Sequence, residues 1–166
     1  MRPPEGTHTL ERHYFCGTRG TMPRLKLSLP AHVDFQTRLT VRITDINYGG
    51  HLANQALLGL LHEARLQFLQ FLGFDELGSA DRPGLIQSDA LIAFRSEAFV
   101  GDILTIKLTA TDFERTSFDL YYEVCTDERL VAQAKTNLAF FDYGIRKAVP
   151  VPDAFHEALT LQRMKK

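Results

Sequence analysis

The sequence has no tryptophan, only two cysteines and no excess of either charge. Cys16 and Cys125 fit neither a CxxC pair, nor a zinc-ligand pattern, nor a disulfide framework, which favours a reduced protein of the cytoplasm. The formal net charge of -1 lacks the basic excess that nucleic-acid-binding proteins carry. We therefore expect a cytoplasmic protein without a nucleic-acid partner.

Long apolar runs are also missing. The longest, from Ala56 to Leu61, is followed directly by His62 and Glu63. A membrane-spanning helix needs roughly 18 apolar residues or more, and the N-terminal stretch lacks the apolar core of a secretory signal. The sequence therefore predicts neither a membrane partner nor a signal peptide.

Several common catalytic signatures are absent as well. No G-x-S-x-G elbow, G-x-x-x-x-G-K-[ST] loop or G-x-G-x-x-G loop occurs, which disfavours a serine hydrolase of the α/β class and the usual nucleotide folds. The pair His62–Glu63 forms only the first half of an H-E-x-x-H metal motif. We expect no metal and no cofactor.

The length of 166 residues suits one domain, and 45% of the residues are hydrophobic, as in ordinary globular proteins. Residues 1–22 are rich in Arg, Pro, Gly and Thr and show no hydrophobic period, so we interpret them as a loosely ordered extension. Residues 23–166 are expected to form the single domain.

Hydrophobic periodicity predicts one strand, one long helix and then more strands. Residues 32–43 place their apolar side chains on one parity, as a half-buried strand does, and residues 45–50 (DINYGG) form a turn. Residues 53–72 carry apolar side chains on more than one stripe, which predicts a mostly buried helix that Gly73 ends.

Four further strands are expected at residues 85–99, 103–113, 117–126 and 130–141, with short polar turns between them as in hairpins. Residues 153–164 are typical of a short amphipathic helix. The pattern predicts an α+β domain in which a five-stranded antiparallel sheet, ending in a four-strand meander, wraps around a long central helix.

The string DINYGGHLAN, followed by LLHEARLQFL, resembles the hotdog-fold thioesterases. The likeness is to the branch of 4-hydroxybenzoyl-CoA thioesterases and acyl-CoA thioester hydrolases, and it spans about residues 32–155. That branch typically shows D-x-D-x-x-x-H-x-x-N before a helix with E-A-R. The matching positions here are Asp45, Asn47, His51, Asn54 and Glu63–Arg65. The resemblance implies a hotdog fold, hydrolysis of acyl-CoA thioesters in fatty acid metabolism, and a homodimer or dimer of dimers.

One departure from the family pattern concerns the chemistry. Asn47 stands where the family has its second Asp, and an amide can neither accept a proton from water near neutral pH nor act as a carboxylate nucleophile. If Asn47 only orients water or substrate, the base must be Asp45, His51 or Glu63. The oxyanion would bind the amides at the start of the helix, from about Leu52 to Gln55, with Asn54 favoured by the resemblance.

Structural roles remain open for the same residues. Asp45 also fits a turn residue that bonds amides near Asn47, and His51 fits a packing or capping residue. Glu63, on a helix expected to be buried, is either an ion-pair partner of Arg65 or of a sheet residue, or a functional carboxylate.

Glu63 also lies nine residues after Asn54, which is about 13 Å along a helix. It therefore cannot reach the start of its own helix. It is either structural or acts in the site of a second subunit.

Three functions are compatible with these residues. Thioester hydrolysis, of an acyl-CoA or less plausibly of an acyl-carrier-protein substrate, is the leading hypothesis. A hotdog hydratase would need a different loop. Asn47 keeps open a non-catalytic module that binds or senses acyl-CoA.

Overall fold

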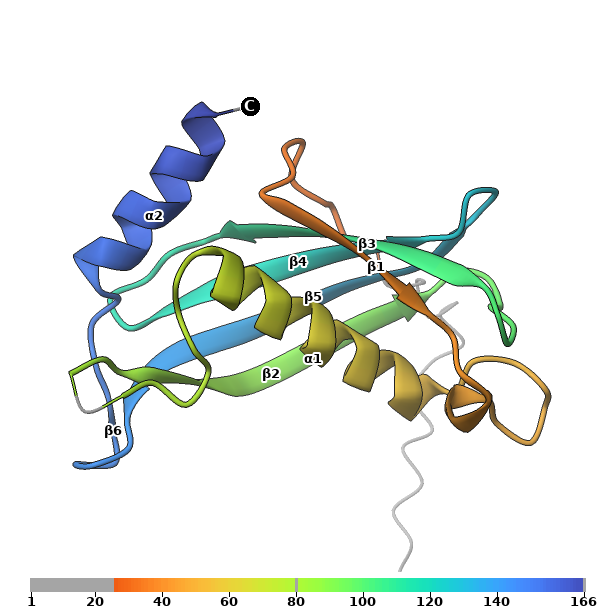
Figure 1. The fold of residues 1–166 in the computed structure, drawn as a ribbon, viewed down its shortest axis with the longest axis horizontal. Coiled ribbons are helices and arrows are strands. Elements are labelled where there is room, and N and C mark those ends of the chain that lie inside the picture. The colour runs from red at the N-terminus through yellow and green to blue at the C-terminus, as the bar shows by residue number, and fades with distance from the viewer. Residues whose placement is uncertain (1–25, 80, 166) are drawn as a thin grey trace, which may run out of the picture.

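An antiparallel sheet curves around one long helix, and a second helix lies beside the end of the sheet (Figure 1). The computed structural model describes residues 26–79 and 81–165, so the extension expected at residues 1–22, with Cys16, lies outside the described residues. The elements are β1 (Phe35–Thr40), the 3-10 helix η1 (Ile43–Asp45), α1 (Asn54–Phe71), β2 (Gly84–Phe94), β3 (Ile103–Thr111), β4 (Ser117–Cys125), β5 (Leu130–Asp142), β6 (Lys147–Ala148) and α2 (Asp153–Met164).

The strand order is β1-β3-β4-β5-β2, and the two-residue strand β6 extends the sheet beside β5. The α+β fold with a sheet around a central helix is as expected, but the four-strand meander is wrong. Only β3, β4 and β5 follow one another as neighbours. Strand β2 pairs with β5, from Gly84 opposite Phe141 to Phe94 opposite Ala132.

The segment between β2 and β3 explains the difference. Instead of forming a hairpin, residues 95–102 carry the chain from β2, at one edge of the sheet, across to β3, which lies next to β1 at the other edge. The turn at Gly101 is bonded to the end of β1, because the Gly101 amide donates to the Val41 carbonyl at 2.9 Å and the Val41 amide donates to the Asp102 carbonyl at 2.9 Å. Strand β1 ends at Thr40, so Ile43 lies outside it, in η1, and is 73% exposed.

Helix α1 buries one face against the sheet, through Leu57, Leu61, Ala64 and Phe68. The prediction of a mostly buried helix is wrong for the opposite face, where Glu63 is exposed and Leu58 is 38% exposed. Two apolar stripes in the sequence therefore do not mean two buried faces. Gly73 ends the helix as expected, with a left-handed φ of 78°.

Helix α2 spans the predicted residues and is fixed at both ends. Near its start, Phe155 contacts Phe74, Phe118 and Phe140 with ring centroids 5.0 to 5.2 Å apart. Near its end, Arg163 donates two hydrogen bonds to the buried carboxylate of Asp34, at 2.7 and 2.9 Å. Among the described residues, neither α1 nor α2 nor any other helix is long and apolar enough to cross a membrane.

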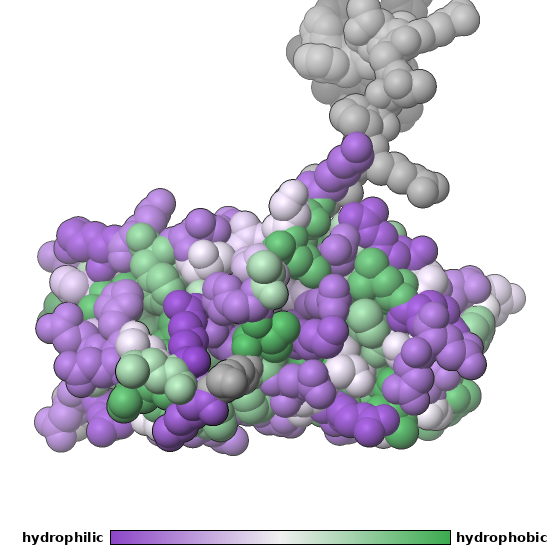
Figure 2. All heavy atoms as spheres, turned by 90° about the horizontal axis from the view of Figure 1, so that it is seen from above, coloured by the Kyte–Doolittle hydropathy of each residue, from purple (hydrophilic) through white to green (hydrophobic). Residues whose placement is uncertain are grey.

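The surface seen from above mixes hydrophilic and hydrophobic side chains, and its apolar patches are interrupted by polar ones (Figure 2). Ion pairs also join side chains of neighbouring strands. Lys107 pairs with Glu123 at 2.8 Å, and Lys135 pairs with Asp119 at 3.1 Å. Cys125, on β4, is a free and partly buried cysteine.

A polar cluster around the buried Arg65 joins α1 to the chain that follows it. The Arg65 guanidinium donates to the carboxylate of Glu76 and, at 2.5 Å, to the side-chain oxygen of Gln87 on β2. His62 lies 2.6 Å from the other oxygen of Glu76. Burial opposes ionisation of this carboxyl, but the hydrogen bond of His62 and the charge of Arg65 outweigh burial and hold the pKa of Glu76 below its ordinary value.

We expect Glu76→Gln to lower the free energy of unfolding by about 1–3 kcal/mol at pH 7, because it removes charge-assisted hydrogen bonds to buried Arg65. The unfolded chain has the ordinary pKa, so the stabilisation is present above that pKa and is lost as pH falls through the lower pKa of the folded state. Urea unfolding between pH 3 and pH 7 measures it. The exposed residue Glu157 gives the control, Glu157→Gln. An equal loss for both variants would contradict this role of Glu76.

Candidate active site

The loop before α1 is a closed turn that its own side chains hold. Asp45 accepts a hydrogen bond from the Arg42 amide at 2.8 Å, and the side-chain oxygen of Asn47 accepts one from the Gly49 amide at 2.8 Å. Gly50 has a φ of 82°, a conformation that glycine adopts without strain. Asp45 thus has a turn-capping role, although toward Arg42 and not toward amides near Asn47.

Helix α1 begins without a side-chain cap. Its N-cap residue is Ala53, which has no oxygen to offer, and its first turn has no acidic residue. The first amides of a helix have no acceptor within the helix. In the described part of the chain, no group accepts a hydrogen bond from the amides of Asn54, Gln55 and Ala56. The start of α1 therefore presents free donors at the positive end of the helix dipole.

The expectation that Leu52 contributes an oxyanion amide is wrong. The Leu52 amide donates to the Ala98 carbonyl at 2.8 Å, and the Ala53 amide donates to the Asp45 carbonyl at 2.8 Å. Both bonds fix the loop against its neighbours, so these amides are not free. The available donors start at Asn54, two residues after Leu52, and continue at Gln55.

His51 lies between the loop and the helix start. Its Nδ1 atom is 3.2 Å from the Leu52 carbonyl oxygen and 3.4 Å from the side-chain nitrogen of Asn47. Its Nε2 atom is 3.8 Å from a carboxylate oxygen of Glu97. The side chain of His51 is 31% exposed, so solvent and substrate have access to the ring.

A pocket of about 250 Å³ opens at this point. Its apolar side comes from Leu57, Phe94 and Val131, and its polar side from His51, Asn54, Arg95, Ser96 and Glu97. The free amides, an imidazole and a carboxylate thus belong to one region. This is the arrangement that polarises a carbonyl and activates water.

The structure brings some of the sequence-predicted residues together and separates others. His51 and Asn54 line the pocket and Asn47 lies beside the His51 ring, while Asp45 accepts the Arg42 amide as a cap of the loop. Glu63 is exposed on α1 and accepts a hydrogen bond from Gln67 at 2.8 Å, while Arg65, one of the partners considered for it, bonds to Glu76 instead. Glu63 is not among the residues that line the pocket.

Glu97 and Arg95 were missed because residues 85–99 were interpreted as one strand. The strand ends at Phe94, and the charged triplet Arg95-Ser96-Glu97 leaves the sheet toward His51. The signal was present in the sequence, since three polar residues interrupt an apolar run. Without the topology, however, nothing connects this segment to a loop more than forty residues earlier.

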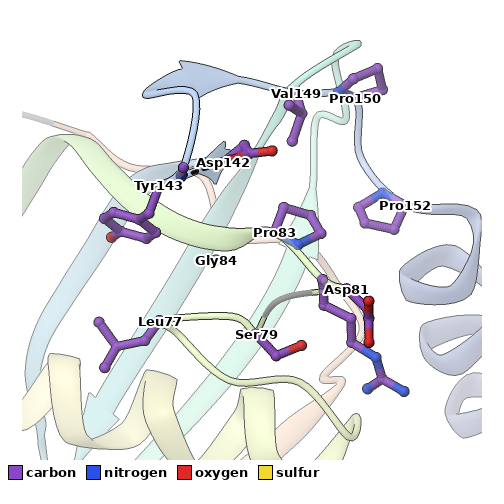
Figure 3. Close-up of a pocket in the computed structure, with 12 residues that line it drawn as sticks. Leu77, Ser79, Asp81, Pro83, Gly84, Asp142, Tyr143, Val149, Pro150 and Pro152 are labelled. Atoms are coloured by element: carbon purple, nitrogen blue, oxygen red, sulfur yellow. Dashed lines mark hydrogen bonds between the residues drawn. The ribbon is translucent and has the colours of Figure 1, made fainter.

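A larger hollow, of about 550 Å³, lies at the other end of β2 (Figure 3). Pro83, Pro150, Pro152 and Tyr143 lie around it. The side chain of Asp142 accepts hydrogen bonds from two amides of the following turn, and the Tyr143 hydroxyl donates one to the Leu85 carbonyl at 3.2 Å. None of the sequence-predicted site residues lines this hollow, and its size therefore does not make it the reactive site.

Residues 41–159 match a family model that is described as the thioesterase-like superfamily. This range contains the loop, α1 and the charged triplet, and so includes every residue of the pocket.

Relatives with the same kind of activity support the match. A 1,4-dihydroxy-2-naphthoyl-CoA hydrolase from Nostoc punctiforme is 28% identical over 133 residues, or 79% of this chain and 90% of that protein. One from Crocosphaera subtropica is 30% identical over 115 residues, or 65% and 82%. The crystal structure of a 1,4-dihydroxy-2-naphthoyl-CoA thioesterase from Synechocystis superposes with a TM-score of 0.69 and 26% identity, covering 76% of this chain and 95% of that one.

Proposed function

The chain belongs to the thioesterase-like superfamily, and we propose that this thioester hydrolase cleaves an acyl-CoA in the pocket at the start of α1. The observation that supports this site most strongly is the uncapped helix start, where the amides of Asn54, Gln55 and Ala56 are free beside His51. The transition state of thioester hydrolysis develops an oxyanion, and free amides at a helix start stabilise that charge.

We assign the proton transfer to His51. Of the candidate bases Asp45, His51 and Glu63, only His51 lines the pocket. An attacking water would give its proton to the imidazole while its oxygen bonds to the thioester carbon. The C–S bond then breaks, and the proton passes to the leaving thiolate, which gives a free acid and free CoA. Asn47 lies beside the ring and orients His51, but it does not take part in the proton transfer.

The acyl group is proposed to be aromatic. The relatives named above act on a naphthoyl-CoA, and the apolar side of the pocket consists of Leu57, Phe94 and Val131. A volume of about 250 Å³ lies below the usual range of roughly 300–1,000 Å³ for small-molecule sites. The pocket of one chain therefore suits the reacting end of the substrate and leaves the rest of the CoA to be bound elsewhere.

We further propose that a second copy of the chain completes the site. Strand β2 is an edge strand of eleven residues, and a long unpaired edge is a surface that another strand tends to cover. The face of α1 that carries Leu58 and Glu63 is exposed as well. Pairing two chains through β2 would cover this edge and bring Glu63 from one chain toward the pocket of the other.

A non-catalytic acyl-CoA module, which Asn47 leaves conceivable, is not favoured, because the named relatives are hydrolases. The two functions differ in turnover, which a direct assay measures.

We expect thiol release from acyl-CoA substrates without added metal, at an undiminished rate in EDTA. The reaction as derived uses only groups of the protein and water. A thiol reagent and a series of short, medium, long and aromatic acyl-CoAs provide the measurement, with aromatic substrates expected to show the highest kcat/KM. Binding without turnover across the whole series would instead identify a binding module.

The free amide of Asn54 can be removed without removing the helix. Proline is tolerated at the first helical position, and Ala53 before it already has the extended conformation that a following proline requires, with φ -71° and ψ 143°. We expect Asn54→Pro to lower kcat by about 10²-fold, the usual effect of losing one oxyanion donor. Asn54→Ala, which keeps the amide, is the matched control. Equal rates for the two variants would show that this amide does not serve the oxyanion.

Glu63 tests whether two chains share a site. We expect Glu63→Gln and the double variant Asn47→Ala/His51→Ala each to be nearly inactive, and mixed dimers to recover activity at about half of their sites. In a mixed dimer, one pocket has an intact loop and faces an intact carboxylate. Light scattering verifies that subunits associate and exchange, and a stable, active monomer would refute the shared site. Full activity of Glu63→Gln alone would identify Glu63 as a structural residue.

A further inference from the structure

The carboxylate that the family pattern places at position 47 is missing from the loop, yet the pocket does contain one. Among the described residues that line it, Glu97 alone carries a carboxylate. Its Oε1 atom is 3.8 Å from Nε2 of His51. A negative charge thus lies beside the imidazole, supplied from the segment after β2 and not from the loop.

The backbone of Glu97 is held firmly although its side chain is 64% exposed. The Arg129 side chain donates to the Glu97 carbonyl at 3.0 Å, and the next residue, Ala98, accepts the Leu52 amide at 2.8 Å. The preceding residue, Ser96, donates its hydroxyl to the Leu130 carbonyl at 2.8 Å. These bonds fix the segment on both sides of Glu97, and one of them ties it to the residue that follows His51.

The surroundings of the His51 ring decide which nitrogen reacts. The Leu52 carbonyl, 3.2 Å from Nδ1, can only accept a hydrogen bond, and it is nearer than the Asn47 amide nitrogen at 3.4 Å, which can only donate, so the carbonyl favours the tautomer with its proton on Nδ1. With Nδ1 protonated, Nε2 holds the lone pair and faces Glu97. When Nε2 takes a proton from water, the ring becomes positive, and a carboxylate nearby stabilises the charged ring.

We propose that Glu97 is the positioning residue of the reaction, which holds His51 and stabilises its protonated form, and so replaces the carboxylate that Asn47 lacks. This inference rests on the proposed function. The role of Glu97 does not change the proton transfers proposed above. Nε2 receives the proton from water as the oxygen bonds to the thioester carbon, and returns it to the thiolate after the C–S bond breaks, while Glu97 stays ionised throughout.

The proposal makes a rescue experiment possible. Asn47 lies 3.4 Å from Nδ1 of the same ring, so Asn47→Asp would return a carboxylate to His51 from the other side. We expect Glu97→Gln to lower kcat by about 10-fold to 100-fold, equivalent to roughly 1.4–2.7 kcal/mol, with KM changed less than about twofold. The double variant Glu97→Gln/Asn47→Asp should recover most of the lost kcat. The exposed residue Glu114, between β3 and β4, gives the charge-matched control, Glu114→Gln.

Acyl-CoA turnover by each full-length variant, with a melting temperature for each, separates the outcomes. A fall in kcat for Glu97→Gln that Asn47→Asp reverses supports the proposal. Unchanged kcat in Glu97→Gln, or a fall that Asn47→Asp does not reverse, overturns it while the proposed function stands. A wild-type chain that hydrolyses no acyl-CoA overturns both.

Discussion

The site depends on the free amides with which α1 begins. A helix leaves its first amides without internal acceptors, and most helices satisfy one of them with a side-chain cap. Here the N-cap is Ala53, which has no oxygen, and the first turn lacks an acidic residue. The amides and the positive end of the dipole therefore remain available to a ligand, and the surrounding structure keeps the helix start in place.

Two segments far apart in the sequence provide that fixation. The loop before α1 is closed by the side chains of Asp45 and Asn47, and residues 95–98 bond to it through Ala98 and Leu52. The second segment reaches the helix start because β2 lies at the edge of the sheet next to β5, and the chain must cross over from there to β3. The crossover thus both connects β2 to β3 across the sheet and brings Arg95 and Glu97 to the pocket. A hairpin between β2 and β3 would have left the pocket without its carboxylate.

The two ends of β2 have different properties. The pocket at the Phe94 end combines free donors with His51, whereas the larger hollow at the Gly84 end has polar side chains that serve turns and carbonyls. The smaller pocket therefore has hydrogen-bonding groups that are available to a ligand, whereas polar side chains of the larger hollow already have partners within the protein. The polar cluster of Arg65, Glu76 and Gln87 lies between these two ends and attaches β2 to α1.

The sequence alone was sufficient for the local features. Alternation and helical periodicity located the strands and both helices to within a few residues, since these patterns reflect which side of an element is buried. The string from Asp45 to Arg65 was specific enough to indicate the family and the region of the site. Tertiary structure decided the rest. Whether β2 pairs with β3 or β5 depends on long-range contacts that no local pattern records. Likewise, the exposed face of α1 bears leucine and phenylalanine, so composition could not distinguish it from the buried face. The amide of Leu52 is occupied, and the carboxylate of Glu97 meets His51, only because the crossover packs against the loop, and this contact joins residues that the sequence keeps more than forty positions apart.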